Sequence, residues 1–188
     1  MDIKIIQEAL SVLKAGGLLL YPTDTVWGIG CDAANEKAVE KIYALKQRAD
    51  SKSLIVLADG ISMVERYVQK VPDTTYMLVA VNDKPLTIIY PAATGLASNV
   101  AAADGSVAIR IVNHPFCKEL LRQFKRPLVS TSANISDEKT PKNFAAISDL
   151  IKQGVDYIVP TAMEQGATQK PSSIIKLGLR NEIQIIRE

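Results

Sequence analysis

Hydrophobic residues near the start of the chain recur at the spacing of a helix. Ile6, Leu10 and Leu13 share one helical face, and Asp2 precedes them where it can cap the first turn. The glycine pair at 16–17 can supply the left-handed residue that ends such a helix. The pattern therefore predicts a first helix that packs through one face.

Short apolar runs and helical segments alternate along the rest of the chain. Helices are predicted from Asn35 to about Leu45, from a capping box over 62–65, and from 114–115 to about Phe124. Apolar runs typical of strands lie at 18–21, 54–57, 86–90, 107–111, 128–131, 157–159, 173–177 and 183–186. A short extended stretch is also predicted after the turn-rich segment 22–25, up to Cys31. Because buried strands show continuous apolar runs, we expect an α/β fold, with an open, twisted, mixed sheet of about seven strands flanked by helices.

Length and composition narrow the class of protein. The 188 residues suffice for one well-buried core, so we expect a single domain over 1–188. A net charge of +2 gives no strong global field for nucleic acid or an anionic membrane. No apolar run reaches the roughly 18 residues of a membrane span, and no signal peptide is evident, so we expect a cytoplasmic protein without membrane contact.

Cys31 and Cys117 are too few for a disulfide framework, and we expect them to fill core space.

The two commonest nucleotide-binding loops, the P-loop and the dinucleotide-binding glycine motif, are absent from the sequence. Three cations cluster instead after the second predicted helix, at Lys46, Arg48 and Lys52. A group of guanidinium and ammonium groups suits a polyphosphate. The alternative is a helix end whose basic residues complement the helix dipole and are solvated.

Small polar residues follow two of the predicted strands. The run Ser130-Thr131-Ser132-Ala133-Asn134 emerges where α/β sheets tend to bind ligands, although a strand end followed by turn chemistry has the same composition. The segment 23–25 after Pro22 can hold a small polar substrate or close a Ser/Thr turn. We expect Trp27 to belong to the core.

Arg110 stands out because it lies within the apolar strand 107–111. An arginine in such a strand must find an anion or expose its head group. A substrate carboxylate would satisfy it bidentately, and a structural salt bridge would satisfy it equally well. His114 is expected to start a helix rather than act as a base. No nucleophile and base stand out, so positioning and charge stabilisation are the expected catalytic devices.

Taken together, four segments resemble the YrdC/Sua5/TsaC family. They are YPTDTVWGIGCDA at 21–33, Lys46-x-Arg48, Val-Ala-Ile-Arg at 107–110 and Ser-Thr-Ser-Ala-Asn at 130–134. The resemblance covers essentially the whole chain and is to the short, one-domain form of the family. It implies an open α/β twist around a concave, positively charged cleft. The chain departs from the family pattern at several positions, one of which is Asp137, where the family has glycine.

The resemblance also implies an activity. Such an enzyme is a nucleotidyltransferase that joins L-threonine, bicarbonate or CO2, and ATP with Mg²⁺ into threonylcarbamoyl-AMP and pyrophosphate. Downstream partner proteins would use this adenylate for the threonylcarbamoyl modification of adenosine 37 (t6A37) in tRNA. The chain itself would bind tRNA weakly if at all.

Matching the family motifs residue by residue implies the site. Threonine binding falls to Thr25, Arg110, Ser130 and Ser173, and ATP binding to Arg48, Lys52, Ser106, Ser132, Asn134, Thr140 and Arg187. Lys46 and Arg48 carry the catalytic role, in which cations neutralise charge on the leaving pyrophosphate. No residue is assigned as a metal ligand.

Two rival functions remain at this point. The first is a non-catalytic protein that binds double-stranded RNA or tRNA, which the small net charge and the scarcity of aromatic residues disfavour. The second is a related carbamoyl-adenylate enzyme with another acceptor, as in hydrogenase-maturation proteins, where a similar domain is fused to others.

Overall fold

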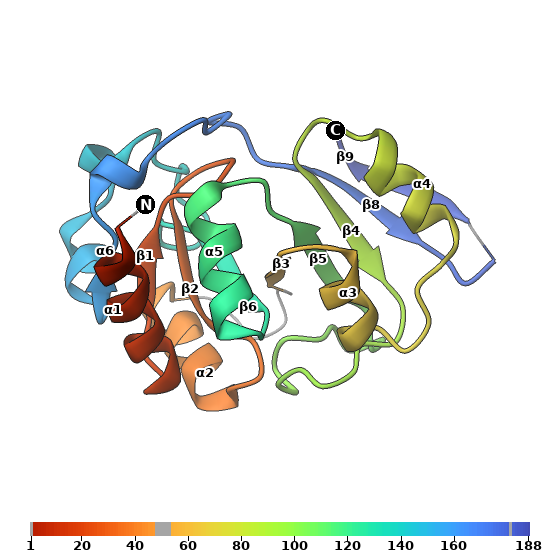
Figure 1. Cartoon of the computed structure of the whole chain (residues 1–188), viewed down its shortest axis with the longest axis horizontal. Helices are drawn as coiled ribbons and strands as arrows, with labels where there is room; N and C mark the ends of the chain where they lie inside the picture. The colour runs from red at the N-terminus through yellow and green to blue at the C-terminus, as the bar shows by residue number, and fades with distance from the viewer. Residues whose placement is uncertain (1, 48–53, 181) are drawn as a thin grey trace.

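The computed structural model of the chain describes residues 2–47, 54–180 and 182–188, and Figure 1 shows its course. Nine strands form one sheet in the order β7-β1-β2-β6-β3-β5-β4-β8-β9. The strands are β1 (Leu19–Tyr21), β2 (Gly28–Asp32), β3 (Ile55–Ala58), β4 (Leu86–Tyr90), β5 (Val107–Ile111), β6 (Leu128–Ser132), β7 (Tyr157–Ile158), β8 (Ser173–Leu177) and β9 (Ile183–Arg187). The helices are α1 (Ile3–Lys14), α2 (Glu36–Leu45), α3 (Ile61–Tyr67), α4 (Thr74–Val81), α5 (Pro115–Phe124) and α6 (Asp149–Gln153), with short 3-10 turns at Phe144–Ala146 and Thr161–Met163.

The sheet is mixed, as predicted, but it is larger than predicted. The pairs β1·β7, β3·β5 and β4·β8 are parallel and the other pairs are antiparallel. Nine strands replace the expected seven or so. Every apolar run forms a strand, and the extended stretch predicted to run to Cys31 forms β2, although glycines at 28 and 30 interrupt its apolar character. The backbone of β2 is completed by pairing with β1 and β6, which a local pattern does not report.

Capping residues fix the starts of α1 and α2 where the sequence places them. Asp2 accepts a hydrogen bond from the Lys4 amide at 2.9 Å, and Asn35 accepts one from the Ala38 amide at 3.1 Å. The capping box predicted at 62–65 is wrong. Gly60, with extended backbone angles, occupies the cap position of α3, so Ser62 already lies inside the first turn and no side chain caps this helix.

The helices are distributed over both ends of the sheet. In Figure 1, α1, α2 and α5 group at the end that holds β1, β2 and β6, whereas α3 and α4 lie at the end that holds β4, β8 and β9. Trp27, Cys31 and Cys117 are buried in the core, as expected, and neither cysteine is in a disulfide. No helix among the described residues is long and apolar enough to cross a membrane.

Candidate functional site

A cavity of about 360 Å³ lies over the middle of the sheet and takes its floor from one sheet face. Register places Ser130 beside Ile55, Ile55 beside Ala108, and Ala108 beside Ile89. Directly opposed residues of paired strands point to the same face, and all four of these residues line the cavity. The row runs across β6, β3, β5 and β4, so strands that are far apart in sequence build one surface.

Gly28 keeps this cavity open on the β2 side. It pairs with Ser132 in β6 and lines the cavity. A Cβ atom at Gly28 would lie 3.0 Å from the Ser130 hydroxyl oxygen and 3.4 Å from the Thr131 carbonyl oxygen. A side chain at this position would therefore take up space beside Ser130, one of the residues that the family motifs assign to threonine binding.

Arg110 brings a buried guanidinium to the cavity. The residue is 5% exposed, and its Nη1 donates to the Thr25 hydroxyl at 2.8 Å and lies 3.4 Å from Asp24 Oδ1. Its Nε is buried without a hydrogen-bond partner among the described residues. The structure thus shows the structural salt bridge of Arg110, while binding of a substrate carboxylate stays a prediction.

The segment 23–25 forms the turn that holds Thr25 against Arg110. The Thr23 hydroxyl donates to the Val26 carbonyl at 2.7 Å and accepts from the Thr25 amide at 3.1 Å, which is a Ser/Thr turn. The loop before β8 fastens this turn from the other side, because the Thr168 and Gln169 amides donate to the carbonyls of residues 24 and 25.

A second guanidinium, that of Arg187, lines the same cavity from β9. Its Nε and Nη2 donate to the Ser172 carbonyl at 3.0 and 2.7 Å, and the Ser172 hydroxyl is 2.7 Å from that of Thr87. Burial, and after it the positive charge of Arg110, lowers the pKa of Arg187. Two arginines that repel each other across one cavity make that cavity favourable for an anion.

Most of the described residues that the sequence assigns to the site meet in this cavity. Those that line it are Thr25, Arg110, Ser130, Ser132, Thr140 and Arg187. Ser173 starts β8 next to Ser172, and its amide donates to the Pro85 carbonyl at 3.1 Å. Ser106 lies outside the lining, in the turn before β5, where its hydroxyl donates to Asp104 at 2.5 Å. Arg48 and Lys52 lie outside the described residues.

Lys46 and Asn134 contact the protein's own backbone. The Lys46 ammonium donates to the carbonyls of Ser132 and Asn134, and the Asn134 side-chain amide donates to those of Ile135 and Glu138. Neither residue lines the cavity. Asp137, in the same segment, has a φ of 67°, which lies in the left-handed region that favours glycine.

Sequence reasoning missed the residues that support the site. Thr87, Ser172 and Asp24 are buried polar residues that bond to site residues or to one another. The signal for each is weak, since it consists of one polar residue beside a motif or in an apolar strand. Among the described residues no cluster of three or more His, Cys, Asp or Glu side chains has the geometry to hold a metal ion. The positive charge of the cleft as a whole stays a prediction, because two of its expected cations are not described.

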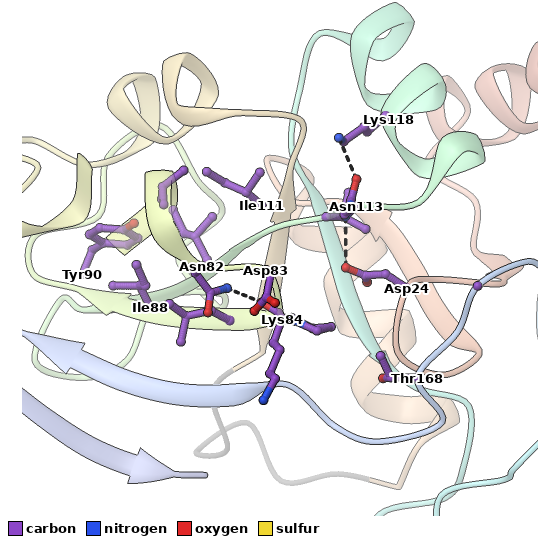
Figure 2. Close-up of a pocket in the computed structure, with 16 residues that line it drawn as sticks. Asp24, Asn82, Asp83, Lys84, Ile88, Tyr90, Ile111, Asn113, Lys118 and Thr168 are labelled. Atoms are coloured by element: carbon purple, nitrogen blue, oxygen red, sulfur yellow. Dashed lines mark hydrogen bonds between the residues drawn. The ribbon is translucent and has the colours of Figure 1, made fainter. Parts of the chain in front are cut away.

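A second cavity, of about 400 Å³, opens beside Ile88, Ile109 and Ile111 (Figure 2). These residues alternate with the floor of the first cavity along β4 and β5, so they face the opposite side of the sheet. Figure 2 also shows the Asn113 backbone amide bonded to Asp24 Oδ2. The other carboxylate oxygen of Asp24 lies 3.4 Å from Arg110 Nη1. None of the site residues assigned from the sequence lines this second cavity.

His114 starts α5, as predicted, and it is the sole histidine of the chain. It is 1% exposed, and burial lowers its pKa, with Asp24 opposing the shift. The unfolded chain then takes up a proton near pH 6.5 while the folded chain does so only at lower pH, so stability falls as pH drops below about 6.5. In the wild type, titration of His114 changes the unfolding free energy by up to about 1.4 kcal/mol per pH unit below about pH 6.5. We expect this pH dependence to be absent in His114→Gln. Denaturant unfolding at several pH values checks this, and equal slopes in both proteins would contradict it.

The chain is similar to known proteins over nearly its whole length. Residues 11–188 match the family model Sua5_yciO_yrdC, described as telomere recombination. The chain is 35% identical to the threonylcarbamoyl-AMP synthase of Pseudoalteromonas translucida over 92% of its length and 93% of that protein. It is also 35% identical to the synthase of Hahella chejuensis, over 93% of this chain and 94% of that one.

Solved structures show the same fold. The crystal structure of E. coli YciO has a TM-score of 0.85 at 23% identity, covering 100% of this chain and 90% of that one. P. abyssi Sua5 complexed with L-threonine has a TM-score of 0.83 at 25% identity, covering 92% of this chain and 50% of that one. The chain thus spans about half the length of that Sua5. The family model and the relatives together show that the chain belongs to the Sua5/YciO/YrdC family.

Proposed function

We propose that this chain is a threonylcarbamoyl-AMP synthase, which makes threonylcarbamoyl-AMP and pyrophosphate from L-threonine, bicarbonate or CO2, and ATP. The observation that carries the proposal is the buried guanidinium of Arg110, which lines the cavity and bonds to the Thr25 hydroxyl, another residue of the cavity wall. Relatives of nearly the same length have this activity in their names, and a related Sua5 was crystallised with L-threonine. These relatives support a catalytic function over the RNA-binding alternative.

Threonine would bind through its carboxylate and its hydroxyl. Arg110 is placed to take the carboxylate in a charge-assisted hydrogen bond, and burial strengthens such a bond. Thr25 and Ser130 line the same cavity and offer hydroxyls that can donate or accept. Ser173 would contribute from the start of β8. The size of the cavity suits an amino acid together with part of a nucleotide.

The chemical step would form a carbamate and then an acyl-phosphate link. The threonine amine is protonated near neutral pH and must lose a proton before it attacks CO2. A carbamate oxygen then attacks the α-phosphorus of ATP, and the bond to the leaving pyrophosphate breaks. Holding both reactants in one cavity supplies much of the rate, and cations that face the pyrophosphate stabilise the charge it gains.

ATP would extend from the threonine site toward the end of β6. Ser132, Thr140 and Arg187 line the cavity and support this placement. Arg48 and Lys52 are the proposed phosphate ligands, with Mg²⁺ arriving on ATP, and Ser106 and Asn134 complete the ATP set implied by the family motifs. The product would pass to the proteins that complete t6A37 in tRNA, so we place this chain in the cytoplasm.

The test of this function is pyrophosphate release from ATP. We expect threonine and bicarbonate together to stimulate release, and each alone to have little effect, because the nucleophile is the carbamate that both form. Arg48→Ala should abolish the stimulation by removing a phosphate ligand. Equal stimulation by threonine in CO2-free buffer would contradict the carbamate route. Steeply salt-dependent RNA binding without pyrophosphate release would favour the RNA-binding alternative.

A further inference from the structure

The ammonium of Lys46 is one of the most deeply buried charged groups described in the protein. The residue is 1% exposed although it follows the last turn of α2. Its Nζ lies 2.6 Å from the Ser132 carbonyl oxygen and 2.5 Å from the Asn134 carbonyl oxygen. Because a buried ammonium is costly unless it is hydrogen-bonded, these two contacts account for much of its placement.

Lys46 joins α2 to the segment after β6 through its backbone as well. Its amide donates to the Ile42 carbonyl, which belongs to the last turn of α2, and its carbonyl accepts from the Ser136 amide at 2.9 Å. One residue thus makes three hydrogen bonds to the stretch 132–136. Each peptide plane is rigid, so fixing the carbonyls of Ser132 and Asn134 also fixes the direction of the chain between them.

That stretch forms one wall of the candidate site. Ser132 lines the cavity, and the amide of the next residue, Ala133, donates to the Trp27 carbonyl at 3.0 Å. The segment is therefore held from two sides, by Trp27, which directly precedes β2, and by Lys46. If either support were lost, the Ser132 hydroxyl would lose its fixed position relative to Arg110 across the cavity.

We propose that Lys46 is a positioning residue and not a phosphate ligand. Its ammonium fixes the two carbonyls and thereby holds Ser132 at the wall of the cavity. To reach a phosphate, Nζ would have to leave both carbonyls, and buried carbonyls without partners are unfavourable. This inference deepens the proposed function, because the wall it describes belongs to the same site. Arg48 and Lys52 would then carry the contact with the leaving pyrophosphate.

Hydrogen exchange in the ligand-free protein tests whether Lys46 holds the segment 132–136 in place, and it does not depend on any enzymatic activity. In Lys46→Met, which keeps much of the side-chain volume, we expect the Ala133 and Ser136 amides to exchange at least about ten times faster, while amides of β3 stay protected. The matched control is Lys41→Met, since Lys41 also lies on α2 and donates to a single backbone carbonyl, that of Gly16, at 2.9 Å. It should leave both amides unchanged. Unchanged exchange in Lys46→Met would overturn the proposal.

The wild-type protein gives a second test that does not depend on a variant folding. In protein labelled with nitrogen-15 and carbon-13, the Lys46 ammonium should give a slowly exchanging NMR signal coupled to the Ser132 and Asn134 carbonyl carbons. We expect pyrophosphate, used as the probe, to leave this signal coupled. Loss of both couplings when pyrophosphate binds would show that the ammonium transfers to phosphate, and would overturn the proposal.

Turnover kinetics separate positioning from a purely structural effect. If Lys46 acts through Ser132, the losses in kcat/KM caused by Lys46→Met and Ser132→Ala should not add. The double variant should then have about the same kcat/KM as the less active of the two single variants. The KM for ATP should rise, because Ser132 belongs to the proposed ATP site. Additive losses in the two variants would instead mean that Lys46 binds phosphate directly. A protein inactive with every substrate would sink the proposed function, and the exchange result would still decide the role of Lys46.

Discussion

Pyrophosphate release that depends on threonine should fall by roughly 100-fold or more in Arg110→Met. Removing one partner of a buried charged pair costs about 2–5 kcal/mol, and each 1.36 kcal/mol is about a tenfold change in rate. Arg110 is the described guanidinium that contacts Thr25, and its Nε is buried without a protein partner. The loss should appear mainly as a higher KM for threonine, which steady-state kinetics will measure.

Two companion variants distinguish this loss from unfolding. Arg110→Met leaves the buried carboxylate of Asp24 without its 3.4 Å ion pair, which can cost about 3–5 kcal/mol of stability. Asp24→Asn combined with Arg110→Met removes the uncompensated charge and should recover much of that stability without recovering activity. Arg122→Met is the matched control, since Arg122 is an exposed arginine of α5 that pairs with Glu119. Normal threonine affinity in Arg110→Met would refute the site.

Gly30→Ala should destabilise the fold by about 3 kcal/mol, at the upper end for overpacking a core. A Cβ at Gly30 would lie 2.4 Å from the Val129 carbonyl oxygen and 2.7 Å from the ring of Tyr21. The first contact is with backbone of the neighbouring strand β6, which cannot move without disturbing the pairing of Gly30 with Ser130. Chemical denaturation monitored by the fluorescence of Trp27 will measure the change.

Gly60→Ala provides the comparison for Gly30. Gly60 has a φ of 179°, an extended conformation open to any residue, and nothing lies within 4 Å of a Cβ built on it. We expect its unfolding free energy to stay within about 0.5 kcal/mol of the wild type. If the two substitutions destabilise the protein equally, the loss of glycine flexibility and not the contact with β6 would be the cause.

Local patterns in the sequence were sufficient for the elements and for the family. The helical spacing of Ile6, Leu10 and Leu13 and the cap at Asn35 depend only on residues within a few positions, so the structure reproduces them. The family resemblance is confirmed as well, since the family model matches residues 11–188. Four motifs taken together identified the family, which no single segment does. The capping box at 62–65 failed because Gly60 offered an earlier cap position, and a pattern alone does not choose between two candidate starts.

The partner of each polar site residue was decided by tertiary structure. Arg110 had two equal candidates in the sequence, and the fold gave it Asp24 and Thr25, the latter 85 residues away, while leaving Nε unpaired. Lys46 reads locally as a cation at a helix end, yet β6 brings the Ser132 carbonyl to it across 86 residues. Burial makes such long-range contacts strong, and only packing determines which groups are buried together.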